Sequence, residues 1–214
     1  MVAAGRGFCI LSIMAQQAFA RHLTEEEYLV LERDSDTKHE FFNGRVFALP
    51  STSFNHRIIA GNLNRHLGNL LKGSWNVGNG ELRVKVEATG LLTYPDGFAV
   101  RGELTLVHEP AATLLNPSFI AEIMSPRTEL YDRTAKFEHY QQIPTLSTYL
   151  LLSENSPRAE QYTRETGSKW TYFAVSGPHA TMEVPALKIS ISLAEIYAGV
   201  EFSDAGEFRR PVSG

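Results

Sequence analysis

Two apolar segments separated by a helical pattern constrain the fold of this 214-residue chain most strongly. The segment PSFIAEIMSP (117–126) is almost wholly apolar except for Glu122, and STYLLLS (147–153) is a second apolar run. Each has the length of a strand that is buried on both faces of a sheet. Residues 128–142 predict a helix between them. Strand, helix and strand in this order indicate a right-handed crossover that joins two parallel strands.

Further local patterns predict the elements that precede this unit. Thr24 followed by three glutamates is typical of a helix N-cap with an acidic first turn, and this helix would end near Arg33. Asn43-Gly44 lies between HEFF and RVFAL and predicts a β-hairpin, because both turn residues tolerate positive φ. Apolar residues at helical spacing predict an amphipathic helix over about 54–72.

The remaining patterns complete an α/β domain. Alternation in LRVKV (82–86) predicts a half-buried strand with Arg83 on its polar side. TYPDGFAVRG (93–102) is a further strand candidate. Segments from 158 to 191 predict a C-terminal antiparallel meander, and 192–200 a short final helix. We therefore expect a mixed central sheet flanked by helices, with an N-terminal helix and hairpin.

The composition excludes several classes of protein. Apolar residues make up 43% and charged residues 21% of the chain, which is typical of a globular domain and not of a disordered, collagen-like or coiled-coil chain. One cysteine, Cys9, cannot build a disulfide framework or a cysteine-based zinc site. The net charge of −4 means that contact with nucleic acid would need a local basic patch.

The first residues allow two interpretations. Residues 8–14, FCILSIM, follow Arg6 and superficially resemble a short secretory signal, although the run is too short to span a bilayer. We favour the alternative that Met14 is the working start and that residues 1–13 are an upstream extension. We accordingly expect a cytoplasmic protein without membrane contact. Its expected parts are an N-terminal extension over 1–22, one domain over 23–202 and a tail over 203–214.

Glu122 is the residue with the clearest chemical implication. A carboxylate inside a buried strand costs several kcal/mol unless a metal, a positive charge or hydrogen bonds compensate it. A second acid, Asp96, lies between Pro95 and Gly97 at the start of another strand. If the two strands are neighbours, both carboxylates can converge on one Mg²⁺ or Mn²⁺ ion. Alternatively, Asp96 caps a turn and Glu122 pairs with an arginine.

Several segments in this order resemble one known family. Pro95-Asp96 followed by Glu122 in an apolar strand is similar to the PD-(D/E)xK nuclease core. The wider set resembles the Uma2 family (DUF820) of endonuclease-like proteins over about residues 24–200. It comprises HEFFNGRVF (39–47), YPD (94–96), NPSFIAEIMSPRT (116–128) and YDRTAKFEHYQQIPTLSTYLLLS (131–153). The resemblance implies a restriction-endonuclease-like fold and metal-dependent hydrolysis of phosphodiester bonds in nucleic acid, DNA in particular.

The chain departs from the superfamily pattern at one position. Met124 stands where the Glu-x-Lys motif has lysine. Lys136, on the following helix as in Uma2-like sequences, is the candidate replacement that would orient the attacking water and offset negative charge. Alternatively, Lys136 pairs with Asp132 on a solvated helix face. Tyr140 lies one turn further along and would either support Lys136 or simply pack.

The resemblance also implies supporting acids and a backbone ligand. Glu40 matches the acidic position of the family's first motif, where it would hold a metal-bound water or a second metal, unless it pairs with Arg45. Glu81 is a weaker metal-ligand candidate at a position where relatives commonly carry an acid. The carbonyl of Ile123 is a further candidate ligand, because such cores often use that backbone oxygen.

Basic residues suggest where nucleic acid would bind. Arg57, Arg65 and Lys72 are spaced to form one stripe on the 54–72 helix, which either follows phosphates or is only a solvated face. Arg127 and Arg133 lie nearer to the expected site. A homodimer is plausible by resemblance, and cutting both strands of a duplex favours two sites related by a two-fold axis.

Other types of site are not indicated. The sequence has no Gly-x-Ser-x-Gly nucleophile motif and no phosphate-binding glycine-rich loop. The histidines show no metal-ligand spacing, and we expect His56 and His66 on the polar, solvated side of their helix. The alternatives to a nuclease are a catalytically silent protein of the same fold that binds nucleic acid or a protein, and a hydrolase acting on a small phosphoester.

Overall fold

The computed structural model describes residues 21–107 and 112–202. The predictions made for residues 1–13, for Cys9 and for the tail 203–214 lie outside the described residues. Among the residues that are described, no helix is both long and apolar enough to cross a lipid bilayer.

The described residues form mixed sheets flanked by a few helices, as predicted. The helical elements are α2 (Glu25–Arg33), α3 (Phe54–Leu70), α4 (Glu129–Tyr131), the π-helical turn η1 (Asp132–Lys136), α5 (Phe137–Tyr140) and α6 (Leu193–Ile196). The first strands are β1 (His39–Phe42), β2 (Arg45–Ala48), β3 (Trp75–Asn79), β4 (Arg83–Val86), β5 (Leu91–Thr93), β6 (Gly97–Arg101), β7 (Leu106–Val107) and β8 (Thr113–Leu114). The later strands are β9 (Phe119–Met124), β10 (Thr148–Ser153), β11 (Arg158–Arg164), β12 (Trp170–Ser176), β13 (Thr181–Val184) and β14 (Ile189–Ser192).

The central sheet has the strand order β12-β11-β10-β9-β6-β3. Its strands β9 and β10 are parallel, with Glu122 opposite Leu151, and the neighbouring pairs are antiparallel. The two apolar segments therefore form the predicted parallel pair. Every residue of β9 is buried, because helices and strands cover both faces of the sheet.

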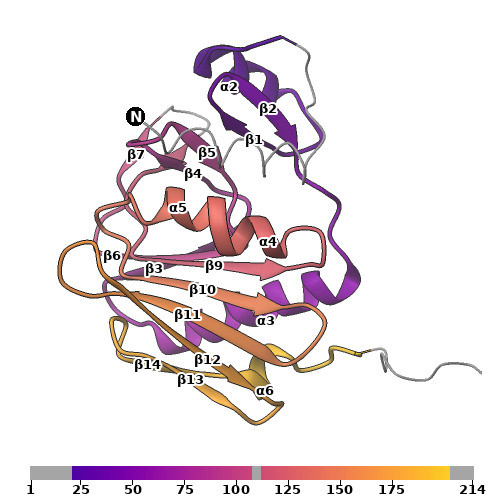
Figure 1. Ribbon diagram of the computed structural model, residues 1–214, viewed down its shortest axis with the longest axis vertical. Coiled ribbons are helices and arrows are strands. Elements are labelled where there is room, and N and C mark those ends of the chain that lie inside the picture. Colours follow the sequence, from indigo (N-terminus) through magenta and orange to yellow (C-terminus); the bar gives the residue numbers. More distant parts are fainter. Residues whose placement is uncertain (1–20, 108–111, 203–214) are drawn as a thin grey trace, which may run out of the picture.

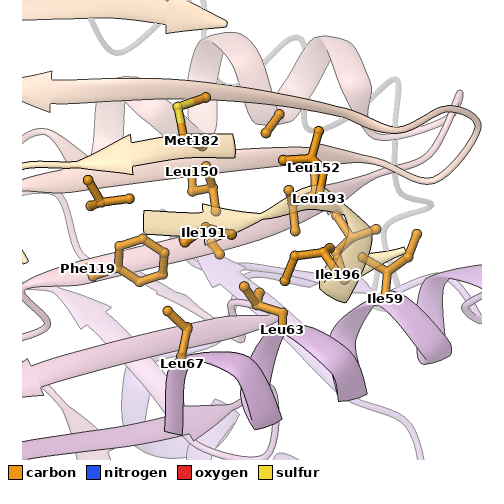
Figure 2. Close-up of a cluster of buried hydrophobic side chains, with 14 of the residues drawn as sticks. Ile59, Leu63, Leu67, Phe119, Leu150, Leu152, Met182, Ile191, Leu193 and Ile196 are labelled. Atoms are coloured by element: carbon orange, nitrogen blue, oxygen red, sulfur yellow. The ribbon is translucent and has the colours of Figure 1, made fainter. Parts of the chain in front are cut away.

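Alternate residues of β9 point to two different cores. Phe119 and Ala121 belong to a cluster that includes side chains of α3, β13, β14 and α6 (Figure 2). Ile120 and Met124 belong to a second cluster, with side chains of α4, η1 and α5. Figure 1 shows α3 on one side of the sheet and α4 and α5 on the other. Glu122 lies between Ile120 and Met124 at two-residue spacing, so its side chain points to the same face of the sheet as theirs. It therefore faces α4, η1 and α5.

The N-terminal helix and hairpin form as predicted. Thr24 caps α2 in a capping box, in which the Glu27 N–H donates to Thr24 Oγ1 and the Thr24 N–H donates to Glu27 Oε2. Asn43 and Gly44 have φ values of 49° and 76°, the left-handed conformation that a two-residue hairpin turn requires. The hairpin β1–β2 lies at the edge of the other six-stranded sheet, of order β2-β1-β5-β4-β8-β7, and joins it through β5.

Three elements differ from their predictions. Arg83, expected on a solvated face of β4, is buried; its Nε donates to Thr113 Oγ1, and its guanidinium lies over the Tyr28 ring. The reason is that α2 and both neighbouring strands enclose β4. The expected helix over 128–142 contains the π-helical turn, and the final helix is a single turn.

Candidate active site

The buried strand β9 and the loop before β6 bring two acids together. Gly97 of β6 pairs with Ala121 of β9, and the same register continued by one residue places Asp96 opposite Glu122. The Glu122 side chain is 5% exposed, whereas that of Asp96 is 22% exposed. The two carboxylates predicted to converge are therefore neighbours, Glu122 buried on β9 and Asp96 more open to solvent just before β6.

Lys136 lies beside Glu122. Its Nζ is 2.9 Å from Glu122 Oε1, and the side chain is 6% exposed. Lys136 is the last residue of the π-helical turn η1, in which Asp132, Ala135 and Lys136 are buried. The Lys136 Nζ is also 3.8 Å from Asp132 Oδ1. The alternative of a solvated Asp132–Lys136 pair is therefore wrong in one respect, because the pair is buried.

The hairpin contributes a third carboxylate. Glu40 of β1 is 2% exposed, and its Oε1 lies 3.3 Å from Lys136 Nζ. Thr93 Oγ1 donates a hydrogen bond to Glu40 Oε1, and Tyr131 Oη donates to Oε2 at 3.0 Å. These contacts hold Glu40 next to Lys136, which therefore has both Glu40 and Glu122 as ion-pair partners.

Tyr140 completes the surroundings of Glu122. Its hydroxyl donates to Glu122 Oε1 at 2.7 Å, and the side chain is fully buried. Burial raises the pKa of Tyr140 well above its ordinary value, so the hydroxyl remains a donor. Tyr140 thus packs in the core and also binds Glu122, the ion-pair partner of Lys136.

The buried cluster of Glu40, Glu122, Asp132 and Lys136 has more acids than bases. Burial raises the pKa of Glu122 to about 8, although Lys136 lowers it. Burial likewise raises the pKa of Asp132 to about 6. For Lys136, burial alone would lower the pKa, but Glu122 and the other acids outweigh it and hold the pKa well above its usual range. The ammonium therefore stays charged, while full ionisation of the acids would leave excess negative charge inside the protein.

Asp96 is fixed by two hydrogen bonds. The Ile123 N–H donates to Asp96 Oδ2 at 2.8 Å, and His56 Nε2 lies 2.8 Å from Asp96 Oδ1. Burial alone would lower the pKa of His56, but Asp96 outweighs this effect and raises it. Asp96 therefore does more than cap a turn, since its carboxylate joins α3 to β9.

The prediction that His56 and His66 are solvated is wrong. Each is only 9% exposed. His56 binds Asp96, and His66 Nε2 accepts a hydrogen bond from the Ser192 N–H at 3.2 Å. Asp96 and Glu154 lie against His56, and Ser192 lies against His66, so a polar position on this helix does not imply exposure.

Two cavities adjoin His56. The larger, of about 690 Å³, has Asp96, Lys38 and Arg57 among its lining residues. The smaller, of about 400 Å³, is lined by Ile123 and Arg127 together with His56. Asp96 is therefore reachable from solvent, and exposed basic residues stand on the walls of both cavities.

Other predicted site residues lie apart from the cluster. Glu81 has a side chain that is 81% exposed and pairs with Lys38 at 2.6 Å. Arg133 pairs with Glu160 at 2.6 Å. Neither residue has a described contact with Glu122 or Lys136.

The three basic residues predicted to form a stripe on α3 each contact a different partner. Arg57 donates to Thr52 Oγ1, and Arg65 pairs with Glu195 at 3.2 Å. Lys72 lies beyond the end of α3 and donates to the Gly68 carbonyl. Of the three, Arg57 is the one that lines a cavity next to Asp96.

Sequence reasoning missed two groups of this site. The spacing of α3 places His56 in solvent, and the sequence indicates Asp132 only as a partner that pairs with Lys136. The Asp132 position did carry a signal, because it lies one helical turn before Lys136. The contact of His56 with Asp96 joins residues 40 positions apart, and no local spacing indicates it.

Comparison with known proteins gives the class to which this arrangement belongs. The chain is a member of the Uma2 family, described as "Putative restriction endonuclease", whose model matches residues 25–194. The expected family resemblance is therefore confirmed over most of the chain.

Two relatives and a solved structure also match most of this chain. The chain is 30% identical to "Uncharacterized protein slr1290" and 28% identical to "Uncharacterized protein sll1609", both of Synechocystis sp.. These alignments cover 84% and 80% of this chain, and 94% and 98% of the relatives. A crystal structure of "a putative nuclease belonging to DUF820 from Anabaena variabilis ATCC 29413" superposes with a TM-score of 0.65 at 17% identity, covering 82% of this chain and 97% of that one. This superposition shows a shared nuclease-like fold.

Proposed function

We propose that this protein is a divalent-metal-dependent nuclease that hydrolyses phosphodiester bonds of nucleic acid, with DNA as its substrate. The observation that carries the proposal is the placement of Asp96 next to Glu122, with the Lys136 ammonium 2.9 Å from Glu122. Membership of a family described as a restriction endonuclease supports the same reaction class.

The donor set fits a hard divalent cation. Mg²⁺ is commonly bound by one or two carboxylates, with waters and substrate phosphates completing its coordination. Among the described residues no group of three or more His, Cys, Asp or Glu side chains is arranged to hold a metal ion, so the proposed ion would have two carboxylate ligands. Asp96 and Glu122 would hold Mg²⁺ or Mn²⁺ together with the Ile123 carbonyl. The bound ion would polarise the phosphate and lower the pKa of a coordinated water.

Each remaining residue of the cluster has a defined part in the proposal. The Lys136 ammonium orients the attacking water and stabilises negative charge that develops on the phosphate. Glu40 keeps the Lys136 side chain in place, and Tyr140 fixes the Glu122 oxygen that faces the lysine. Asp132 adds negative charge that favours the protonated lysine. No covalent enzyme intermediate is required.

Nucleic acid would approach through the two cavities that His56 lines. Arg57 and Arg127 line these cavities and are exposed, so they can contact phosphates. Arg65 and Arg133 are paired with glutamates and are weaker candidates. We extend the proposal to a homodimer, because cutting both strands of a duplex favours two sites related by a two-fold axis.

A cleavage assay tests this function. The purified protein is incubated with supercoiled plasmid, linear duplex DNA and RNA, in Mg²⁺, in Mn²⁺ and in chelator. We expect ion-dependent cleavage of DNA that falls by at least about 100-fold in Glu122→Gln, which removes a proposed ion ligand, and in Lys136→Met, which removes the ammonium.

Asp96→Ala and Arg21→Met are the matched controls for this assay. Asp96→Ala should be inactive, whereas Arg21→Met, which breaks the exposed ion pair with Glu27 of α2, should cleave normally. Cleavage that survives in Asp96→Ala would come from a contaminating nuclease and would refute the assignment. A wild-type protein that binds DNA without cutting it would instead be a silent member of the fold.

A further inference from the structure

His56 is held in one orientation by groups on several elements. It lies in the first turn of α3, where its backbone N–H donates to the Oγ of the N-cap residue Ser53 at 3.0 Å. The same Ser53 hydroxyl donates to Glu154 Oε2 at 3.0 Å, and Glu154 lies 3.9 Å from His56 Nδ1. The imidazole is thus enclosed between the start of α3 and the end of β10, with its side chain 11% exposed.

The imidazole directs one nitrogen at Asp96. Because an ionised carboxylate only accepts hydrogen bonds, the 2.8 Å contact requires that His56 Nε2 carries the proton. The other oxygen of Asp96 accepts from the Ile123 N–H at 2.8 Å. Each oxygen is therefore held by one donor and keeps a further lone pair free. Two donors on different elements fix both the position and the rotation of this carboxylate.

We propose that His56 is a positioning residue that orients the Asp96 carboxylate for cation binding beside Glu122. The inference rests on the proposed function, because it needs Asp96 to be an ion ligand. Glu122 is buried and fixed by Tyr140 and Lys136, whereas Asp96 is partly exposed and precedes its strand. Without His56, one donor would remain to hold the more exposed of the two proposed ligands. Hydrogen-bonding partners of ligating side chains typically contribute 10–100-fold to metal affinity.

Two amide variants separate positioning from simple packing. In His56→Gln the side-chain amide nitrogen can reach about as far as Nε2, whereas in His56→Asn it is one methylene shorter. Both variants keep a polar amide in the same enclosure. His66→Gln is the matched control, because His66 is buried on the same helix but binds Ser192 rather than Asp96.

The readouts are the affinity for Mn²⁺ by isothermal titration calorimetry and the rise in melting temperature that Mn²⁺ produces. We expect His56→Asn to weaken Mn²⁺ binding 10–100-fold, His56→Gln to stay within about threefold of the wild type, and His66→Gln to bind Mn²⁺ unchanged. A purely structural role would lower the ion-free melting temperature and leave the affinity as it is.

The outcomes distinguish this inference from the proposed function. Wild-type protein that binds Mn²⁺ while His56→Asn binds it equally well overturns the positioning role and leaves the nuclease proposal standing. Equal weakening in His56→Gln and His56→Asn also overturns it, because the retained donor would then be irrelevant. Wild-type protein that binds no Mn²⁺ overturns both.

Discussion

The residues of the site show how one buried ammonium is kept charged. Lys136 is 6% exposed, and a lone ammonium at such a position would lose its proton readily. The Lys136 Nζ lies 2.9 Å from Glu122 Oε1 and 3.3 Å from Glu40 Oε1, and these carboxylates favour the protonated form of the lysine. The lysine and its acids are therefore mutually dependent, and removing either side leaves an uncompensated buried charge.

Replacing Lys136 by methionine should destabilise the protein in a pH-dependent way. Without the ammonium, the buried acids must either ionise unpaired or take up protons. We expect the free energy of unfolding to fall by about 3–5 kcal/mol at pH 8 and by less at pH 5.5, where protonation relieves the charge. Urea unfolding at both pH values measures the difference.

Arg65→Met serves as the control for this comparison, since the Arg65–Glu195 pair is exposed and should contribute about 1 kcal/mol or less at either pH. An equal loss of stability at both pH values in Lys136→Met would mean that ionisation of the acids does not govern the effect.

The raised pKa of Glu122 predicts the direction in which stability changes with pH. Between the ordinary glutamate pKa of 4.5 and the folded value of about 8, the folded state holds a proton that the unfolded state has released. Raising the pH through this window therefore lowers the free energy of unfolding, by up to about 1.4 kcal/mol per pH unit. Asp132 adds to the same trend between pH 3.8 and about 6.

Unfolding of the protein in chelator, at steps from pH 5 to pH 8.5, measures this slope. In Glu122→Gln the contribution of the carboxyl is gone, so the slope above pH 6 should largely disappear. A wild-type slope of the opposite sign, or an unchanged slope in the variant, would contradict the burial of an ionisable Glu122.

The sequence predicts some site residues well because their neighbours are informative. Glu122 is recognisable as the one acid inside an apolar strand, and Asp96 follows the tyrosine-proline pair that the family pattern marks. His56 is not predictable in this way, because helical spacing gives the face of α3 and not what covers that face. The hydrogen bonds that Tyr131 and Thr93 donate to Glu40 likewise join residues far apart in the sequence, and no local pattern indicates them.

At the scale of elements, apolar patterns predict the parallel strands β9 and β10, the helix α3 and the hairpin with little error. These elements carry strong local signals, including a capping serine or threonine and an Asn-Gly turn. The pattern failed for β4, where Arg83 is buried through bonds to Thr113 and Tyr94. A charged residue in an alternating strand is assigned to solvent unless the partners that enclose it are known.

The pairing of β3 with β6 depends on a glycine. Gly78 lies opposite Phe98, and a Cβ at Gly78 would overlap the aromatic ring. We expect Gly78→Ala to lower the free energy of unfolding by about 1–3 kcal/mol, because the strand beside Asp96 must shift. Chemical denaturation measures the loss.

The same substitution at Gly68 is the control for Gly78→Ala. A Cβ there meets nothing within 4 Å, so Gly68→Ala in the exposed part of α3 should stabilise the protein by about 0.5–1 kcal/mol. If Gly78→Ala were as stable as the wild type, the close approach of Phe98 to the backbone would be excluded.

At the scale of the whole molecule, the site joins segments that are distant in sequence. The hairpin supplies Glu40, the sheet supplies Asp96 and Glu122, and the π-helical turn supplies Lys136. The parallel pair β9–β10 sets the position of that turn, because the helical segment α4–η1–α5 connects the two strands across one face (Figure 1). Folding of the complete domain is therefore needed to assemble the candidate site.

The central claim is that Asp96 and Glu122 hold one cation between them. The most direct measurement is an anomalous difference map from crystals of the wild-type protein soaked in Mn²⁺. The account predicts one strong peak in each chain between these two carboxylates, and its loss in crystals of Glu122→Gln. A map without a peak there, or with Mn²⁺ bound only at other residues, would contradict the account.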